Sequence, residues 1–222
     1  MKKNSDSFWP SYTDLMTSLF FIMLVLYVLT YVRLNSTIKL QKEKLAIIEA
    51  VEQTLKPLKK EKSLFVYEEE YKRFKLAFNV KFATGKSEIN NQELENFETT
   101  ISKIDQAGYK LKNIIDTLNK LKNTDKKLKN VSYILVLAGY ASRNGTELEN
   151  YKLSYLRSLN LKNYWKNKGI NFESEQYNGL IDLQISGNGW GGVGRIMDFV
   201  HESDNQRFLI QIFPKIGNLT ND

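Results

Sequence analysis

The chain has 222 residues, a formal net charge of +7, no cysteine and a single histidine, His201. Without cysteine there are no disulfides, thiol nucleophiles or cysteine-based zinc sites, and one histidine excludes a multi-histidine metal site. The Lys residues are spread along the chain, and several directly follow an apolar stretch. An anionic membrane surface is therefore a nearer partner for them than a nucleic acid. We therefore expect no cofactor, no metal and no nucleic-acid partner.

The first element is an apolar stretch, FWPSYTDLMTSLFFIMLVLYVLTYV, from Phe8 to Val32. From Trp9 onward it would extend about 36 Å as a helix, enough to cross a bilayer with modest tilt. Trp9 at one end and Tyr27 and Tyr31 toward the other suit the two membrane interfaces. No small-residue cleavage site follows, so we predict an uncleaved membrane helix within residues 1–33. Basic residues flank both ends, so the positive-inside rule does not decide its orientation.

Asp14 is the only formal charge inside this stretch. A carboxylate in the hydrocarbon costs ~2.5–3.5 kcal/mol on insertion scales, which makes it a functional candidate. Thr17 and Ser18 follow at the third and fourth positions after it, so the three side chains form a polar patch on one helix face. That patch is expected to face protein or a water-filled cavity. The alternative is an Asp14 at the interface or at the N-cap of a helix that begins late.

Residues 34–62 are predicted to form a helical linker. Apolar residues recur there at spacings near three and four, at Ile38, Leu45, Ile48, Val51, Leu55 and Leu58. This spacing is typical of an amphipathic helix, which would either form a short parallel coiled coil or lie as a monomer on the globular domain. Pro57 is expected to end or kink the helix.

Residues 63–222 alternate strand and helix patterns. We predict two short strands within 63–82 that form a hairpin, then a helix over 91–123 with Gly108 as a candidate break. A buried strand follows at 131–141, then a helix over 149–170 ended by Gly169, and strands at 180–187 and 206–214. The fold class is α+β, with helices that cover one face of a mixed sheet.

Three segments of this region resemble OmpA-like peptidoglycan-binding domains: FATGKSEIN (82–90), ILVLAGYASRNGTELENYKLSYLRS (134–158) and NQRFLIQI (205–212). The resemblance covers about Leu64 to Pro214. The second segment matches the family spacing at Gly139, Gly145, Asn150, Leu153, Ser154 and Arg157, and the third supplies Arg207. The resemblance implies a peptidoglycan-binding site at Ser142, Asn150, Leu153, Arg157 and Arg207.

Two positions depart from the family pattern. Tyr140 stands where the family has His, and Ser142 takes the slot of an acid fifteen residues before Arg157. The resemblance implies that the acid and the Arg hold the amine and the carboxylate of the diamino acid in the peptide stem. Arg157 can still pair with a carboxylate, but Ser142 offers no counter-charge to an ammonium, so we expect weaker, altered or lost binding. The structural alternatives are an exposed helix Arg157, an N-cap Asn150 and a core Leu153.

An enzyme is not expected. GWGGVG (189–194) formally matches a dinucleotide fingerprint, but it lacks the strand–helix–strand setting and a suitable acid about 20 residues later. His201 has no identifiable catalytic partners.

The order of an N-terminal membrane helix with Asp14, a helical linker and an OmpA-like domain is similar to MotB-type stator B subunits of ion-driven motors. The N-terminal stretch is most similar to B subunits of the Zorya anti-phage defence system (ZorB). This resemblance implies a single-pass inner-membrane protein with a cytoplasmic N-terminus and a periplasmic C-terminal domain. It implies two copies of the chain inside a ring of a polytopic MotA-like A subunit. Asp14 would carry H⁺ or Na⁺ with Thr17 and Ser18 along its path. The alternatives are a flagellar-type stator subunit and a passive wall anchor.

Overall fold

The structure is a computed structural model that describes residues 8–125, 128–191 and 205–216, with side chains from Tyr12 onward. His201 and residues 192–194 of the glycine-rich stretch lie outside the described residues. The chain divides into two compact units, Met1–Ala46 and Ile47–Asp222, which are described separately.

The first unit consists of most of one helix, α1 (Phe8–Lys60), which is long and apolar enough to cross a membrane. Its large apolar side chains between Leu15 and Leu34 are all exposed, with Leu15 at 65%. The helix begins at Phe8, six residues before Asp14, so the alternative that Asp14 caps a late-starting helix is wrong. Asp14 instead lies within the helix, where it is exposed together with Thr17 and Ser18.

The last part of α1 belongs to the second unit. Val51, Leu55 and Leu58 are buried there in the core of the globular domain. These three positions of the apolar stripe therefore pack against their own domain, as the monomeric alternative expects, whereas Ile38 and Leu45 are exposed. The helix continues through Pro57 and ends one turn later, at Lys60. The expected domain boundary between residues 62 and 63 stays a prediction.

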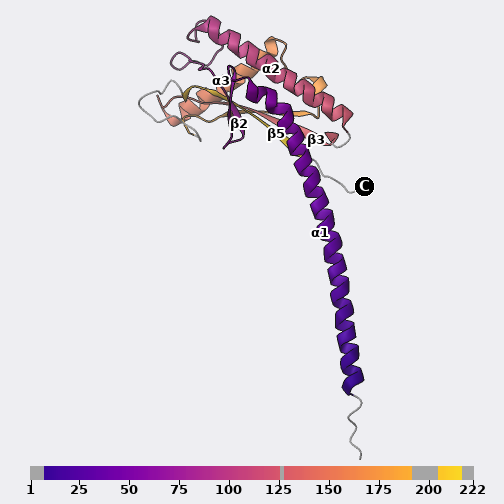
Figure 1. Cartoon of the computed structure of the whole chain (residues 1–222). Coiled ribbons are helices and arrows are strands. Elements are labelled where there is room, and N and C mark those ends of the chain that lie inside the picture. The colour runs from indigo at the N-terminus through magenta and orange to yellow at the C-terminus, as the bar shows by residue number, and fades with distance from the viewer. Residues whose placement is uncertain (1–7, 126–127, 192–204, 217–222) are drawn as a thin grey trace, which may run out of the picture. The chain divides into compact units, whose positions relative to one another are not determined.

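The second unit contains a five-stranded mixed sheet (Figure 1). Its strands are β1 (Phe65–Glu68), β2 (Arg73–Leu76), β3 (Val131–Gly139), β4 (Ile181–Gly187) and β5 (Phe208–Ile216), in the order β1-β2-β5-β3-β4. β3 and β4 are parallel and the other neighbours are antiparallel. The predicted hairpin is confirmed as β1 and β2, and the α+β class is confirmed.

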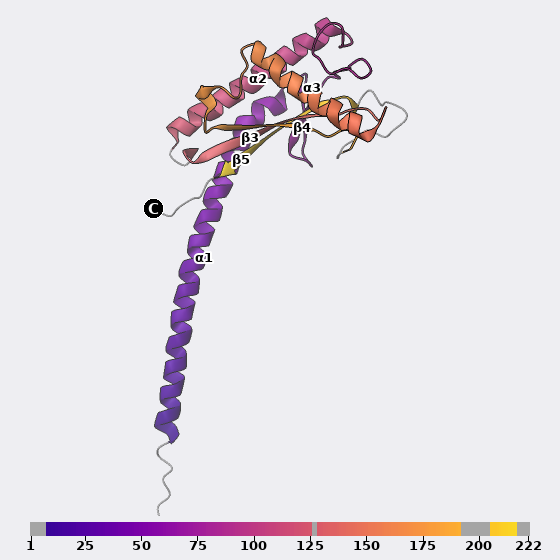
Figure 2. The same ribbon diagram turned by 180° about the vertical axis from the view of Figure 1, so that it is seen from behind.

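Two helices, α2 (Phe97–Thr124) and α3 (Glu147–Asn167), cover one face of this sheet, and a short 3₁₀ turn follows at Glu175–Tyr177. Figure 2 shows α3 lying across β3 and β4. Alternate residues of β3, among them Leu135 and Leu137, share a core with Leu111 of α2 and Trp165 of α3. The period of two along β3 directs these side chains to the helical face.

Gly108 does not break a helix, contrary to the expectation from sequence, because α2 runs through it. A Cβ at this position would lie 2.5 Å from Nε1 of Trp165. That indole N–H donates to the carbonyl of Ile104 at 3.0 Å. Gly108 therefore makes room for the ring that joins α3 to α2. The predicted end of α3 at Gly169 is confirmed, and this glycine has φ +79°.

Close contact between α3 and the sheet also depends on small residues. A Cβ at Gly139 would lie 2.1 Å from the carbonyl oxygen of Ser154, and one at Gly187 would lie 2.5 Å from the backbone nitrogen of Tyr155. The Ser158 hydroxyl donates to the carbonyl of Ser186 at 2.8 Å. The ends of β3 and β4 therefore fix α3, and with it the side chain of Arg157.

Candidate functional site

The start of α3 is held by its own loop. Thr146 is the N-cap and forms a capping box with Glu149, whose pKa is lowered by the hydrogen bonds from Thr146. The buried amide of Asn150 donates to the carbonyls of Asn144 and Thr146, at 2.8 and 2.9 Å. The alternative that Asn150 is the N-cap is therefore wrong. Its side-chain nitrogen ties the loop to the helix instead.

Ser154 and Ser142 lie where the loops after β3 and β4 meet. The fully buried Ser154 hydroxyl accepts from the backbone N–H of Gly189 at 2.8 Å. The carbonyl of Gly189 in turn accepts from the N–H of Ala141 at 2.8 Å, directly before the buried Ser142. The two loops are thus bonded to each other and to α3.

A pocket of about 490 Å³ opens between α3 and two loops, within the size range of small-ligand sites. It is lined by Thr84, Gly85, Asn144, Gly145, Glu149, Asn150, Lys152, Leu153 and Leu156. Two of the five residues expected to bind peptidoglycan, Asn150 and Leu153, are among these. Leu153 is half-buried on the pocket wall and so is not only a core residue.

Arg157 lies one turn after Leu153 and is 2% exposed, so the alternative of an exposed helix arginine is wrong. Its Nε donates to the carbonyl of Lys86 at 3.1 Å, and its guanidinium lies 4.4 Å from the ring centre of Phe82. Burial lowers the pKa of the guanidinium to about 10, so it stays protonated at neutral pH. Its Nη1 is covered by protein yet has no acceptor among the described residues. A buried charged donor without an acceptor is costly, because the hydration that it loses is not replaced.

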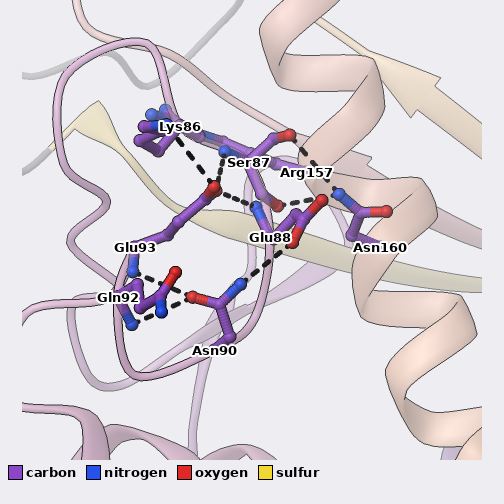
Figure 3. Close-up of polar contacts among 8 residues, drawn as sticks. All are labelled: Lys86, Ser87, Glu88, Asn90, Gln92, Glu93, Arg157 and Asn160. Carbon is purple, nitrogen blue, oxygen red and sulfur yellow. Dashed lines mark hydrogen bonds and ion pairs between the residues drawn. The ribbon is translucent and has the colours of Figure 1, made fainter.

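The turn that receives Arg157 is held from both sides (Figure 3). The Glu93 carboxylate accepts from the N–H groups of Ser87 and Glu88, at 3.0 and 2.7 Å. These bonds lower the pKa of Glu93, and the bond from Glu88 has the larger effect. From α3, the amide of Asn160 donates to the carbonyl of Ser87 at 3.0 Å. Sequence reasoning missed Glu93 and Asn160. Asn160 could have been found because it lies three residues after Arg157, on the same helix face.

Arg207 lies just before β5 and contacts a different ring. Its guanidinium is 5.1 Å from the ring centre of Tyr140, whose hydroxyl also accepts from Arg73 at 3.5 Å. Tyr140, which stands in the family's His position, is thus a buried ring between two arginines. Ser142, Arg157 and Arg207 are not among the pocket-lining residues, so the structure brings Asn150 and Leu153 together in the pocket without these three.

The three residues expected along an ion path, Asp14, Thr17 and Ser18, are exposed on α1. The Thr17 hydroxyl donates to the carbonyl of Thr13 at 2.8 Å, one turn back in the same helix. Their role in ion transfer stays a prediction. Across the described residues, no group of three or more His, Cys, Asp or Glu is placed to hold a metal ion.

No protein-family model matches the sequence, and no curated protein matches it. Solved structures do. A MotB-like protein from Desulfovibrio vulgaris is 18% identical, with 74% of this chain and 95% of that chain covered and a TM-score of 0.41. The periplasmic domain of Helicobacter pylori MotB is 15% identical, with coverage of 66% and 86% and a TM-score of 0.36. The cell wall anchor of the type VI secretion system from Pseudomonas aeruginosa is 13% identical, with coverage of 73% and 96% and a TM-score of 0.39.

Proposed function

We propose that this chain is the B subunit of an ion-driven stator in the inner membrane that serves anti-phage defence, and that its globular domain binds peptidoglycan. The observation that carries the binding part is Arg157, a buried cation whose Nη1 lacks an acceptor in the described part of the chain. Arg157 does not itself line the pocket, but it directly follows the pocket-lining Leu156 on α3. The membrane part rests on the exposed apolar surface of α1 and on the resemblance of its sequence to such subunits.

In the proposed binding mode, a carboxylate of the peptide stem pairs with the Arg157 guanidinium. An arginine holds a carboxylate by parallel N–H bonds, and the surrounding protein strengthens them by keeping water out. Leu153 and Leu156 supply an apolar wall for the carbon chain of the stem residue. Ser142 brings no negative charge to the stem amine, and the Glu149 carboxylate of the pocket is engaged by Thr146 in the capping box. In this binding mode the recognition therefore rests on the carboxylate.

In the proposed motor, two copies of α1 lie inside a ring of a polytopic MotA-like subunit, with the N-terminus in the cytoplasm and the globular domain in the periplasm. Asp14 takes up a proton or a sodium ion and releases it as the ring steps past. Thr17 and Ser18 lie on the same stretch of helix and line the path. Each charge that crosses the membrane yields ~2.3 kcal/mol per 100 mV, which is the source of torque. The wall-bound domain keeps the B subunit from turning with the ring.

A flagellar-type stator would use Asp14 in the same way and differ in its partners. A passive wall anchor would bind peptidoglycan and leave Asp14 without a role in ion transfer. The substitution Asp14→Asn separates the passive anchor from both motors, because it removes the charge and keeps the shape of the side chain.

The test is phage plating on cells that carry the gene with its native neighbours. We expect wild type to protect and Asp14→Asn to abolish protection. The control Glu49→Gln, which changes an exposed carboxylate of the same helix, should protect fully, all at equal membrane abundance by immunoblot. Equal protection by wild type and Asp14→Asn would refute the ion-carrier role. Failure of wild type against a broad phage panel would refute the defence role, and motility would then be the next assay.

Binding to the cell wall is tested separately. Arg157→Gln should reduce retention of the protein on purified sacculi at least tenfold.

A further inference from the structure

We propose that Glu93 is a positioning residue of the Arg157 site and acts on the guanidinium through the peptide group that joins Lys86 to Ser87. This proposal rests on the proposed binding of a stem carboxylate at Arg157. Glu93 and Arg157 bond to opposite ends of the peptide group between Lys86 and Ser87, and this group would transmit the effect of Glu93 (Figure 3).

The two bonds belong to opposite ends of the same peptide group. Its N–H, on Ser87, donates to Glu93 at 3.0 Å, and its carbonyl, on Lys86, accepts from Nε of Arg157 at 3.1 Å. In a trans peptide the N–H and C=O point in opposite directions. A carboxylate at the N–H end and a guanidinium at the C=O end therefore both align with the peptide dipole. Each bond polarises the group in the sense that strengthens the other.

The next peptide group repeats this arrangement. The N–H of Glu88 donates to the same Glu93 oxygen at 2.7 Å, and the carbonyl of Ser87 accepts from Asn160 at 3.0 Å. Two consecutive peptide groups are thus held between one carboxylate and two side chains of α3. The turn cannot rotate either carbonyl away from α3 without breaking a bond to Glu93.

This clamp explains how a buried cation is tolerated without an ion pair in the described residues. The negative charge of Glu93 acts on Arg157 through the peptide group between them. Glu93 does not bond to Nη1, which has no acceptor among the described residues. The other charges around the carboxylate are Lys86, whose Nζ is 3.8 Å from the second Glu93 oxygen, and Glu88, whose own carboxylate accepts from Asn90. From α3, Arg157 donates to the carbonyl of Lys86, and Glu149 and Lys152 line a pocket together with Thr84 and Gly85, directly before this turn.

The test measures binding of the soluble peptide L-Ala-γ-D-Glu-meso-diaminopimelate to the full chain in detergent by titration calorimetry. Glu93→Gln keeps the size of the side chain and removes its charge, so we expect binding to weaken about tenfold, because a charge-assisted bond is replaced by a neutral one. The control Glu88→Gln changes the neighbouring acid of the same turn and should stay within about twofold of wild type. In an Arg157→Gln background, Glu93→Gln should have no further effect.

Unchanged or tighter binding by Glu93→Gln, together with weak binding by Arg157→Gln, would overturn the inference and leave the proposed function standing. Wild-type binding by Arg157→Gln would instead overturn the proposed function. A measurement on the unmutated chain guards against a variant that fails to fold. In a pH titration by NMR, the Arg157 Nε–H signal should shift in step with the Glu93 carboxylate carbon. An Arg157 signal that ignores Glu93 protonation overturns the inference by itself.

Discussion

The two units of this chain differ in how they depart from an ordinary soluble protein: one exposes apolar side chains, and the other buries a charged one. Along α1 up to Ala46, large apolar side chains such as Leu15, Phe20 and Leu24 are exposed. In the globular unit, the charged side chain of Arg157 is buried and one of its donors has no described acceptor. Each arrangement is unfavourable for a chain alone in water. We infer from this difference that the two units need different surroundings: an apolar one for the helix and, under the proposed function, an anionic ligand for Arg157.

The largest expected effect concerns the helix. Replacing both Phe20 and Leu24 by Arg puts two charges one turn apart in the centre of the apolar stretch, at a cost of roughly 5–7 kcal/mol on insertion scales. We expect the double variant to lose most of its resistance to alkaline carbonate extraction. The control Leu34→Arg, at the end of the stretch, should stay membrane-bound because its side chain can reach the interface. A double variant that extracts like wild type would show that lipid does not surround this surface.

The second effect concerns the packing of α3 against β3. Gly139→Ala forces a methyl group to 2.1 Å from the carbonyl of Ser154, where backbone cannot yield easily. We expect a loss of about 3 kcal/mol in the free energy of unfolding of the globular domain, measured by denaturant titration. Gly191→Ala is the matched control, because its methyl group would meet only ordinary contacts, at 3.5 Å with the Tyr151 hydroxyl and 3.6 Å with the carbonyl of Asn188. Equal stability of the two variants would show that α3 does not pack closely on β3.

The sequence predicts the secondary-structure elements of this chain better than it predicts the contacts between them. Periodicity located the hairpin, β3 and α3, because alternation and helical spacing follow directly from which face is buried. The spacing of Asn150, Leu153 and Arg157 located the candidate site through a family resemblance. Contacts between distant segments were not predictable: Gly108 was read as a break because its partner Trp165 lies 57 positions later.

The polar network around Arg157 shows the same limit. Glu93 bonds to backbone N–H groups five and six residues before it, a contact that depends on the shape of the turn and has no characteristic sequence spacing. That Asn150 is a loop clamp and not a cap also required coordinates, because Thr146 and Asn150 are both residue types that favour helix starts. A local pattern predicts which elements form, and tertiary packing decides which side chain each donor meets.

The third effect separates binding from stability at the buried cation. Arg157→Met keeps an unbranched side chain of similar reach and removes the charge. It also removes the Nε bond to the Lys86 carbonyl and the Nη1 donor that has no acceptor in the described part of the chain. We expect retention on sacculi to fall at least about 100-fold, which corresponds to ~2.7 kcal/mol. The free energy of unfolding should stay within about 1 kcal/mol of wild type or rise, because replacing a buried charge by an apolar group is often neutral or stabilising. A variant that keeps wall binding, or one that unfolds, would mean that Arg157 serves the fold and not a ligand.

The smallest effect concerns the pH dependence of stability. The bonds from Ser87 and Glu88 lower the pKa of Glu93 in the folded chain, so the unfolded chain binds the proton more readily. The stabilisation from this carboxylate is therefore complete above its ordinary pKa and is lost as the pH falls through the lower, folded value. We expect the wild-type melting temperature to fall between pH 7 and pH 3 more steeply than that of Glu93→Gln. Glu88→Gln should keep the steeper wild-type slope, since its carboxylate accepts only from the Asn90 side chain in the recorded contacts. Parallel curves for wild type and Glu93→Gln would mean that the turn holds its shape, and keeps the Lys86 carbonyl toward Arg157, without the charge of Glu93.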